Sequence, residues 1–315
     1  MSRGIVGITA LIPPELVYGC GWSPLDLNNQ IPFTTRRVGP KLCAWTALWR
    51  DMVLGGDYQL DKLVVVAGGD CLNAMVDGQR LDLSGLDTHY FFYPFREDRE
   101  AFEKELAGLA NFLGGITEPE AFHSIHRLKE RGLELDRLRT KGKLPSDAFS
   151  QLISFSDLGG DPERFGRELD DYLVANRDRE PDFRHKVALL GVPPINHDFH
   201  AVCQELGLQV VFDELPYEFL RARGRTMEEL ITTYMNYSFS RPLKYRLGLL
   251  RQELETRKVD GIIHYTQYAC HHILEDGLLR EELTQPLLTV QGDMPGPLSQ
   301  QTRLRLEAFA EVLDR

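Results

Sequence analysis

The run Lys-Leu-Val-Val-Val-Ala at residues 62–67, apolar after its first residue, constrains the fold more than any other part of the sequence. Because apolar and polar residues do not alternate in it, both faces of this strand must be buried, which is typical of a parallel sheet covered by helices. Other strands and helices are predicted nearby at residues 4–10, 13–19, 40–54 and 88–93. This strand–helix alternation predicts an α/β domain, which we place at residues 1–97.

The pattern changes in the middle of the chain and then returns. From residue 98 to residue 180, apolar residues recur at helical spacing among many charges, and no strand is predicted. After this helical segment the strand–helix alternation resumes, with elements expected at residues 186–190, 198–206, 209–213, 261–265, 287–290 and 299–313. We therefore predict a second parallel-sheet domain at residues 181–315, with the helical segment packed on the two domains or bridging them.

Length and charge exclude several classes of protein. A chain of 315 residues is long enough for two α/β domains. Its net charge of −11 argues against a nucleic-acid-binding protein, which needs a basic face to neutralise phosphates. The apolar stretch at residues 5–11 is too short for a signal-peptide core or a membrane span, and no later stretch reaches the required length. We expect a cytoplasmic protein that binds neither nucleic acid nor membrane.

The five cysteines do not form a recognised covalent or metal-binding motif. Their number is odd and their spacing uneven, so they do not resemble a disulfide framework. No two of them are spaced as Cys-X-X-Cys, so zinc-ribbon and ferredoxin signatures are both absent. In a reducing compartment they would be metal ligands, nucleophiles or buried thiols. Any ligand set must therefore be assembled by folding.

Three of the cysteines share one kind of position. Cys71 and Cys270 each follow a predicted strand and precede a predicted helix, with Asp70 as the expected cap of the first helix. Cys43 lies near the start of the helix that Pro40 introduces. Helix N-termini stabilise a thiolate or an anionic cluster, and open α/β sheets bind ligands at the carboxyl ends of their strands. We predict that these three thiols converge on one cleft; the alternative is that each is a small buried apolar residue.

The other two cysteines differ from these three. Cys20 follows a predicted helix between Gly19 and Gly21, at the end where the helix dipole disfavours a thiolate. It remains an alternative fourth ligand, or a loop residue beside the cleft. Cys203 lies in the middle of a predicted helix on a face expected to be buried, and we predict a structural role for it.

Several histidines lie close to the predicted cleft. His271 and His272 follow Cys270 directly, but neighbouring residues on a helix point about 100° apart, so one of the two is expected to face the cleft. His197 and His200 lie after a strand end and could meet a ligand, whereas His264 lies inside a strand and is expected to pack or hydrogen-bond there. The Gly-X-Ser-X-Gly, Walker A, His-Glu-X-X-His and Gly-X-Gly-X-X-Gly motifs are all absent, which disfavours the enzyme classes that use them.

A set of stretches in a fixed order carries a resemblance to a known family. They are Ile-Pro-Pro-Glu-Leu-Val-Tyr-Gly-Cys-Gly-Trp-Ser-Pro at 12–24, Lys-Leu-Cys43-Ala-Trp, Gly-Gly-Asp-Cys71, Lys-Val-Ala-Leu-Leu-Gly-Val-Pro at 186–193, Tyr-Ala-Cys270, Gln-Gly-Asp-Met-Pro-Gly at 291–296, and Gln-Thr-Arg-Leu-Arg-Leu-Glu-Ala-Phe at 301–309. In these stretches the chain resembles the 2-hydroxyacyl-CoA dehydratase D-component family. That family also includes benzoyl-CoA reductase subunits and double-cubane-cluster proteins.

The resemblance implies a fold and a cofactor. The fold would be two flavodoxin/Rossmann-like parallel-sheet domains with an iron–sulfur cluster at their interface. By motif position, Cys43, Cys71 and Cys270 would hold a [4Fe–4S] cluster whose fourth iron takes a ligand other than cysteine. Cys20 stands where the family usually has a small residue. It could complete an all-cysteine site, which would favour electron relay over substrate activation.

The resemblance also implies an activity and partners. The chain would be the iron–sulfur subunit of an anaerobic lyase or ATP-dependent reductase. Such an enzyme dehydrates a 2-hydroxyacyl-CoA through a ketyl radical, or reduces an acyl-CoA-like substrate. An ATP-hydrolysing iron–sulfur activator would supply the electron, and an identical or homologous second subunit would complete the dimer. The alternatives are an electron-transfer subunit that carries a cluster but has no substrate of its own, and a cluster-free structural subunit.

Overall fold

The computed structural model describes the whole chain except residues 1, 40–41, 69–70, 178 and 181. Its described strands form two four-stranded sheets that are parallel throughout. In the first sheet the order is β2-β1-β3-β4, with bounds Ser23–Asp26, Ile5–Thr9, Lys62–Gly68 and Thr88–Phe92. In the second the order is β6-β5-β7-β8, with bounds Leu208–Asp213, His185–Gly191, Gly261–Gln267 and Leu287–Gly292. The predicted fold class is confirmed.

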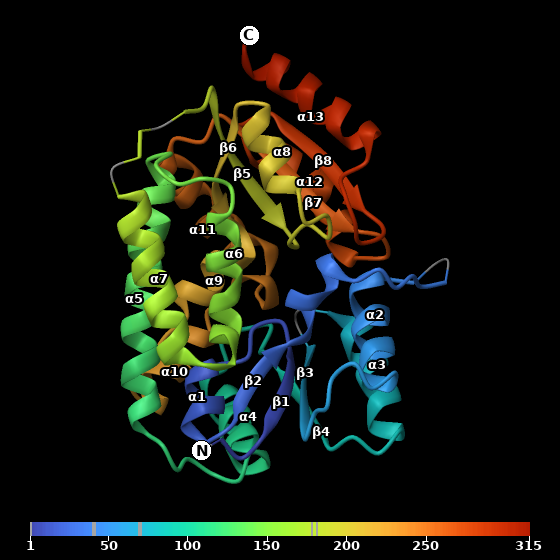
Figure 1. Ribbon diagram of the computed structural model, residues 1–315, viewed down its shortest axis with the longest axis vertical. Helices are drawn as coiled ribbons and strands as arrows, with labels where there is room; N and C mark the ends of the chain where they lie inside the picture. Colours follow the sequence, from blue (N-terminus) through green and yellow to red (C-terminus); the bar gives the residue numbers. More distant parts are fainter. Residues whose placement is uncertain (1, 40–41, 69–70, 178, 181) are drawn as a thin grey trace.

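Helices surround both sheets (Figure 1). Those of the first domain are α1 (Pro14–Gly19), α2 (Ala44–Leu54) and α3 (Leu72–Leu83). The middle of the chain forms α4 (Arg99–Phe112), α5 (Glu120–Thr140), α6 (Ala148–Ile153) and α7 (Pro162–Asn176). The last part forms α8 (Phe199–Glu205), α9 (Glu214–Arg221), α10 (Met227–Tyr234), α11 (Leu243–Arg257), α12 (Asp276–Glu282) and α13 (Gln300–Leu313). Among the described residues, no helix combines the length and apolar character needed to cross a membrane.

Strand β3 shows why the unbroken apolar run predicts a covered sheet. Val64 and Val66 point into one core cluster, and Leu63 and Val65 point into another on the opposite face. All four side chains are fully buried. Burial on both faces leaves no position in the strand for a polar side chain, which explains the absence of alternation.

The largest core cluster joins parts of the chain that lie far apart in sequence. It contains residues of β1, β3 and β4, of the helices from α4 to α7, and of the stretch 219–239 around α9 and α10. In Figure 1, α5, α6 and α7 run along one side of the molecule from the first sheet towards the second. Residues 219–239, which follow β5 and β6 of the second sheet in sequence, therefore pack into the core of the first domain.

A buried polar network stabilises this junction. The Nζ of Lys129 on α5 lies 3.0 Å from Oε1 of Glu15 on α1 and donates to the hydroxyl of Tyr234 on α10 at 2.6 Å. It also donates to the carbonyl of Ala222 at 2.8 Å. Lys129, Glu15 and Tyr234 are fully buried. A buried ion pair of this kind joins α1, α5 and α10 at one point. Removing one partner would leave an unpaired charge buried between all three helices.

Two details differ from the sequence-based expectation. Strand β2 was not predicted, because its four residues include Pro24 and are too few for a periodic pattern. Helix α3 is capped by Cys71, whose Sγ accepts a hydrogen bond from the amide of Ala74 at 3.4 Å. The roles predicted for Pro40 and Asp70 lie outside the described residues.

Candidate functional site

A cavity of about 440 Å³ lies between the two domains, at the carboxyl ends of both sheets. In each sheet the order of strands places the first and third of its strands, β1 with β3 and β5 with β7, side by side in the centre. Their connections leave in opposite directions, which opens a crevice where such folds bind ligands. Residues that end or follow these four strands line the cavity: Thr9, Ala10, Cys71, Val192, Gln267 and Cys270. The two crevices therefore face each other across one space.

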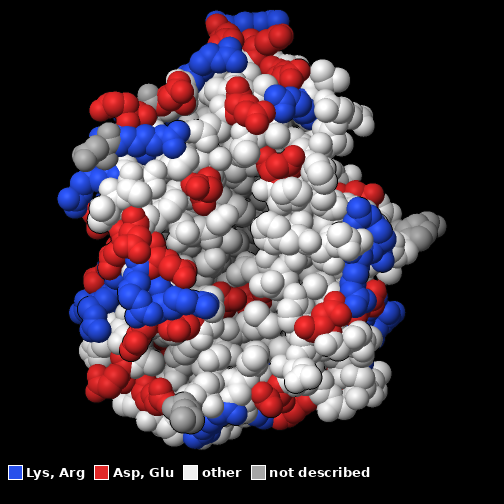
Figure 2. Space-filling view, in the orientation of Figure 1, with Lys and Arg blue, Asp and Glu red and all other residues white. Residues whose placement is uncertain are grey.

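Most of the cavity wall is uncharged. Figure 2 shows a hollow near the centre of the molecule whose surrounding atoms belong mainly to residues other than Lys, Arg, Asp and Glu. Apolar side chains that line the cavity include Trp45, Trp49, Phe149, Ile153 and Phe219. A volume of this size with apolar walls and a few polar groups is typical of a small-molecule or cofactor site.

The structure brings the three predicted cysteines to this one cavity. Cys43, Cys71 and Cys270 all line it, although they come from widely separated parts of the chain. Each is an N-cap residue: Cys43 of α2, Cys71 of α3 and Cys270 of the 3-10 turn His271–Glu275. The predicted placement at helix N-termini is confirmed. Among the described residues, no three His, Cys, Asp or Glu are grouped as the ligands of a single metal ion.

Direct contacts hold the two domains together beside the cysteines. The Nδ2 of Asn73, two residues after Cys71, donates to the carbonyl of Ala269 at 3.1 Å. Ala269 immediately precedes Cys270. Ile195 of the second domain is fully buried in the core cluster that covers one face of the first sheet. The loops that carry Cys71 and Cys270 are thus linked across the cleft by a hydrogen bond.

The backbone is strained at three places around the cavity. Ala10, after β1, has a φ of 55°, Leu158, between two lining residues, has a φ of 54°, and Ala269, before Cys270, has a φ of 62°. Non-glycine residues rarely adopt this left-handed region, at a cost of about 1 kcal/mol or more for each residue. Such strain concentrates where a fold has to aim a loop at a ligand. Its position here supports the assignment of the cavity as the functional site.

The environment of Cys43 favours a negative charge more than its burial alone would allow. Burial raises the pKa of the Cys43 thiol, while the neighbouring backbone amides of Thr46 and Trp45 lower it. Those amides belong to the first turn of α2, where unsatisfied N–H groups point at the cap. A bound metal deprotonates a coordinating thiol outright, and the same amides would then stabilise the sulfur.

Four histidines line the cavity as well: His197, His200, His271 and His272. The sequence predicts that one of the adjacent pair faces the cleft; both line the cavity, and the segment that carries them is a 3-10 turn and not an α-helix. Burial and the neighbouring His272 lower the pKa of His271 to about 4. The Nδ1 of His272 lies 2.9 Å from the carboxylate of Glu275, which orients the ring.

His264 is placed as predicted, away from the cavity. It is fully buried inside β7, and its Nδ1 lies 2.9 Å from a carboxylate oxygen of Asp276. This pair joins the middle of β7 to the first residue of α12.

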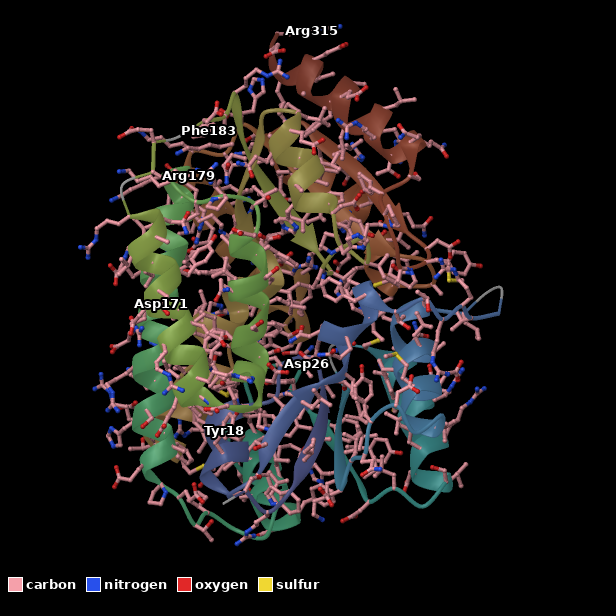
Figure 3. All side chains as sticks on the ribbon, viewed as in Figure 1. Tyr18, Asp26, Asp171, Arg179, Phe183 and Arg315 are labelled. Atoms are coloured by element: carbon pink, nitrogen blue, oxygen red, sulfur yellow. The ribbon has the colours of Figure 1, made fainter. Side chains whose placement is uncertain are left out.

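Two buried carboxyl groups on the wall were not predicted from the sequence. Asp26, at the end of β2, and Asp157, in the turn after α6, both line the cavity. The backbone amide of Asp26 donates to Oδ2 of Asp157 at 2.8 Å, and Oδ1 of Asp26 accepts from the amide of Asn28 at 3.0 Å. Figure 3 places Asp26 between the first sheet and the helices of the central segment. No local sequence pattern could have predicted that Asp26 and Asp157 interact, because they lie 131 positions apart in the sequence.

The proton held by Asp26 makes the stability of the fold depend on pH. Burial, together with repulsion from Asp157, raises the pKa of Asp26 from 3.8 to about 7. Between these two values the folded state binds a proton that the unfolded state does not, so the free energy of unfolding falls as the pH rises. We expect Asp26→Asn to remove this dependence. Between pH 5 and pH 8 the wild type should lose on the order of 2 kcal/mol more than the variant in denaturant titrations. An equal loss in both proteins would contradict this assignment.

The remaining cysteines lie outside the cavity. Cys20 is the C-cap of α1 and is fully buried in the largest core cluster, where burial raises the pKa of its thiol to about 11. Helix α1 runs away from the carboxyl edge of the first sheet, so Cys20 at its C-terminal end lies far from the cleft. The structure therefore does not bring Cys20 to the cavity that Cys43, Cys71 and Cys270 line. Cys203 is fully buried in the core beside the second sheet, as predicted, and burial raises its pKa.

The fold and the site together define a two-domain α/β protein with a cysteine-lined cavity between its domains. A sequence model of the family described as 2-hydroxyglutaryl-CoA dehydratase, D-component, matches residues 9–313. The chain therefore belongs to the 2-hydroxyglutaryl-CoA dehydratase D-component family, and the resemblance found in its motifs is confirmed. A comparison with curated proteins finds no match.

Proposed function

We propose that the chain is the iron–sulfur subunit of a 2-hydroxyacyl-CoA dehydratase-like enzyme, with a [4Fe–4S] cluster held by Cys43, Cys71 and Cys270. The observation that carries this proposal is the position of the three thiols, which reach one interdomain cavity from three separate helix N-termini. Thiolates are the usual ligands of iron–sulfur clusters, and helix N-termini favour the negative charge of such a group. The donor set and its surroundings therefore fit this cofactor.

The location of Cys20 favours a catalytic subunit over an electron-relay subunit. All five cysteines are described in the structure, and only three of them line the cavity. Three thiols leave one iron of a four-iron cluster without a cysteine. When bound, such a cluster would supply low-potential electrons and a Lewis-acidic iron that a substrate oxygen can reach.

The chain's own residues would prepare the cavity for the substrate. Aromatic side chains such as Trp49 and Phe219 exclude water, which strengthens polar interactions inside the site. Gln267 is buried and lines the cavity; its Nε2 donates to the carbonyl of Asp293 at 2.6 Å. Its Oε1 is buried and has no hydrogen-bond partner among the described residues. The apolar walls and this anchored side chain would together shape the cavity around a 2-hydroxyacyl thioester.

The proposed enzyme needs two partners. An ATP-hydrolysing iron–sulfur activator would deliver single electrons, and a second identical or homologous subunit would complete the dimer. The reaction is then a dehydration of a 2-hydroxyacyl-CoA, which is started by one electron that makes the hydroxyl group able to leave and is redox-neutral overall because the product gives that electron back, or a reduction of a related acyl-CoA. The family description, which names a component of a dehydratase, supports this assignment.

Turnover under strictly anaerobic conditions tests the proposal. Iron-loaded protein is mixed with an activator, ATP and a panel of 2-hydroxyacyl-CoA esters that includes 2-hydroxyglutaryl-CoA, and the enoyl-CoA product is measured by chromatography. We expect product with at least one ester, and none when ATP or the activator is left out. A cluster that accepts the electron while no ester is converted would favour the relay alternative instead.

A further inference from the structure

We propose that His200 is a catalytic residue of this cavity, which carries a proton to and from the substrate, and that Asp213 is its positioning residue. This inference rests on the proposed function, because it names the proton carrier for that same reaction. It concerns a wall of the cavity that contains none of the three cysteines. Its evidence is a buried histidine–carboxylate pair that the cluster does not require.

The pair is built into the second domain. His200 lies in the first turn of α8, and its Nε2 is 2.9 Å from Oδ1 of Asp213, the last residue of β6. Its side chain is only 10% exposed, yet it lines the cavity. The side chain of Asp213 is 1% exposed, and its Oδ2 accepts a hydrogen bond from Nη1 of Arg139. The end of β6, the first turn of α8 and helix α5 thus meet at the carboxylate of Asp213.

The charge of Asp213 fixes the state of the ring. Although burial raises its pKa, attraction to His200 and Arg139 leaves the pKa of Asp213 below its ordinary value, so it is ionised at neutral pH. An ionised carboxylate only accepts hydrogen bonds, and Nε2 must therefore carry a hydrogen. In the neutral ring, Nδ1 is then the basic nitrogen, and it has no hydrogen-bond partner among the described residues. Asp213 would also stabilise the imidazolium that forms when Nδ1 takes a proton.

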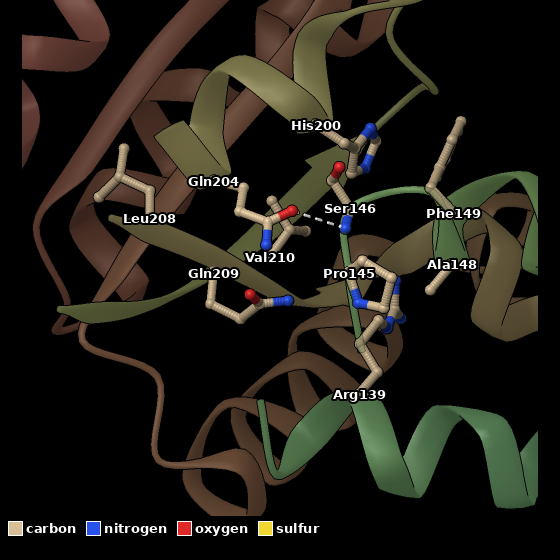
Figure 4. A pocket seen from close by; sticks show the side chains of 10 residues that line it. All are labelled: Arg139, Pro145, Ser146, Ala148, Phe149, His200, Gln204, Leu208, Gln209 and Val210. Carbon is tan, nitrogen blue, oxygen red and sulfur yellow. Dashed lines mark hydrogen bonds between the residues drawn. The ribbon is translucent and has the colours of Figure 1, made fainter. Parts of the chain in front are cut away.

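One face of the His200 ring is covered by an aromatic side chain, and the ring lines both the main cavity and a second, much smaller one. The ring of Phe149 on α6 stacks on His200 with a centroid distance of 4.0 Å and an interplanar angle of 19°. Behind it lies a cavity of about 10 Å³, which has room for about one water molecule (Figure 4). There Oε1 of Gln204 accepts a hydrogen bond from the amide of Ser146 at 2.8 Å and joins α8 to the loop before α6.

Few charged groups surround the pair. The ring of His200 contacts Asp213 at the end of β6. Asp213 also accepts a hydrogen bond from the guanidinium of Arg139 on α5. The thiol of Cys203 on α8 lies close enough to Asp213 for the charge of the carboxylate to affect its pKa. Burial and Asp213 raise the pKa of Cys203, so this thiol is neutral at pH 7. Phe149 and Phe199, which flank the ring, carry no charge. Asp213 is therefore the charged group in direct contact with the His200 ring.

The proton balance of a dehydration matches a single carrier of this kind. Nδ1 of His200 would accept the proton that leaves the carbon next to the hydroxyl-bearing carbon. The electron pair of that C–H bond stays with the substrate and forms the new double bond, and the electron pair of the C–O bond departs with hydroxide. His200 then returns its proton to the hydroxide, which leaves as water, and the ring is neutral again.

The test compares His200→Gln with a matched control. His185→Gln removes a histidine with the same kind of pairing, because Nε2 of His185 lies 2.8 Å from a carboxylate oxygen of Asp314, but His185 does not line the cavity. We expect His200→Gln to keep its iron and its KM while kcat falls at least ~100-fold, and to lose the acid limb of the pH–rate profile. His185→Gln should keep wild-type kcat.

A second measurement needs neither cluster nor substrate. In protein labelled with nitrogen-15 histidine, the shifts of His200 should report a hydrogen on Nε2, and Asp213→Asn should shift the ring towards the other tautomer. Full activity of His200→Gln in a preparation whose wild type turns over would overturn the inference and leave the proposed function standing. A wild type that binds iron but converts no ester would overturn both. An unchanged tautomer in Asp213→Asn would overturn the positioning role of Asp213.

Discussion

Lys129→Met is expected to lower the free energy of unfolding by ~3–5 kcal/mol, the cost of breaking a buried ion pair. The carboxylate of Glu15 would remain fully buried without its cation, and the hydroxyl of Tyr234 would lose a hydrogen-bond partner at 2.6 Å. Because the pair joins α1 to α5 and α10, the loss should loosen the first domain against the central helices. Guanidinium titration followed by circular dichroism measures the change.

Two further variants show whether charge burial is the cause. Lys104→Met removes a lysine that is 73% exposed and pairs with Glu100, and it should change stability little. Lys129→Met combined with Glu15→Leu removes both charges, and it should be more stable than the single variant because no unpaired charge stays buried. A single variant that unfolds within 1 kcal/mol of the wild type would show that the network contributes little.

Replacing any one of Cys43, Cys71 and Cys270 by serine is expected to remove most of the bound iron. The three residues line the same cavity, and in the proposed cluster each would supply one thiolate that a hydroxyl cannot replace as a ligand of iron. The folded protein should survive, because Cys71 and Cys270 are only partly buried and serine is itself a good N-cap. Iron and acid-labile sulfide assays on anaerobically purified variants, beside thermal unfolding, separate loss of the cofactor from loss of the fold.

The two other cysteines provide the matched control. Cys20→Ala and Cys203→Ala remove fully buried thiols that lie outside the cavity. Both should lower stability modestly and leave the iron content per folded chain unchanged. Loss of iron in Cys20→Ala, with retention in Cys43→Ser, would show that the ligand set differs from the one proposed here.

Local sequence predicted the fold and the positions of two of the three cavity cysteines for the same reason. The apolar run that becomes β3 requires cover on both faces, and the alternation of strands with helices then leaves little choice but parallel sheets. In such a sheet a residue between a strand and the next helix must lie at the carboxyl edge. Cys71 and Cys270 occupy that position, so their approach to the cleft follows from the order of elements alone.

The rest of the site depends on contacts that have no local signal. Asp26 and Asp157 meet across the boundary between the first sheet and the central segment, and β2, which carries Asp26, is too short to show a period. In the sequence, Asp213 is only a polar residue at the end of an apolar strand. It becomes the partner of His200 because α5 and α8 pack against β6 in the folded protein. Likewise, burial of Cys20 in the core depends on where α1 packs, which its flanking glycines do not reveal.

The iron and sulfide content of the wild-type protein, purified without exposure to oxygen, tests the central claim most directly. The account predicts about four irons and about four sulfides per chain, with the visible absorption of an iron–sulfur cluster that bleaches on reduction. A protein that is folded by circular dichroism and contains no iron after anaerobic reconstitution with iron and sulfide would contradict the account. It would leave the chain as a cluster-free subunit of its family.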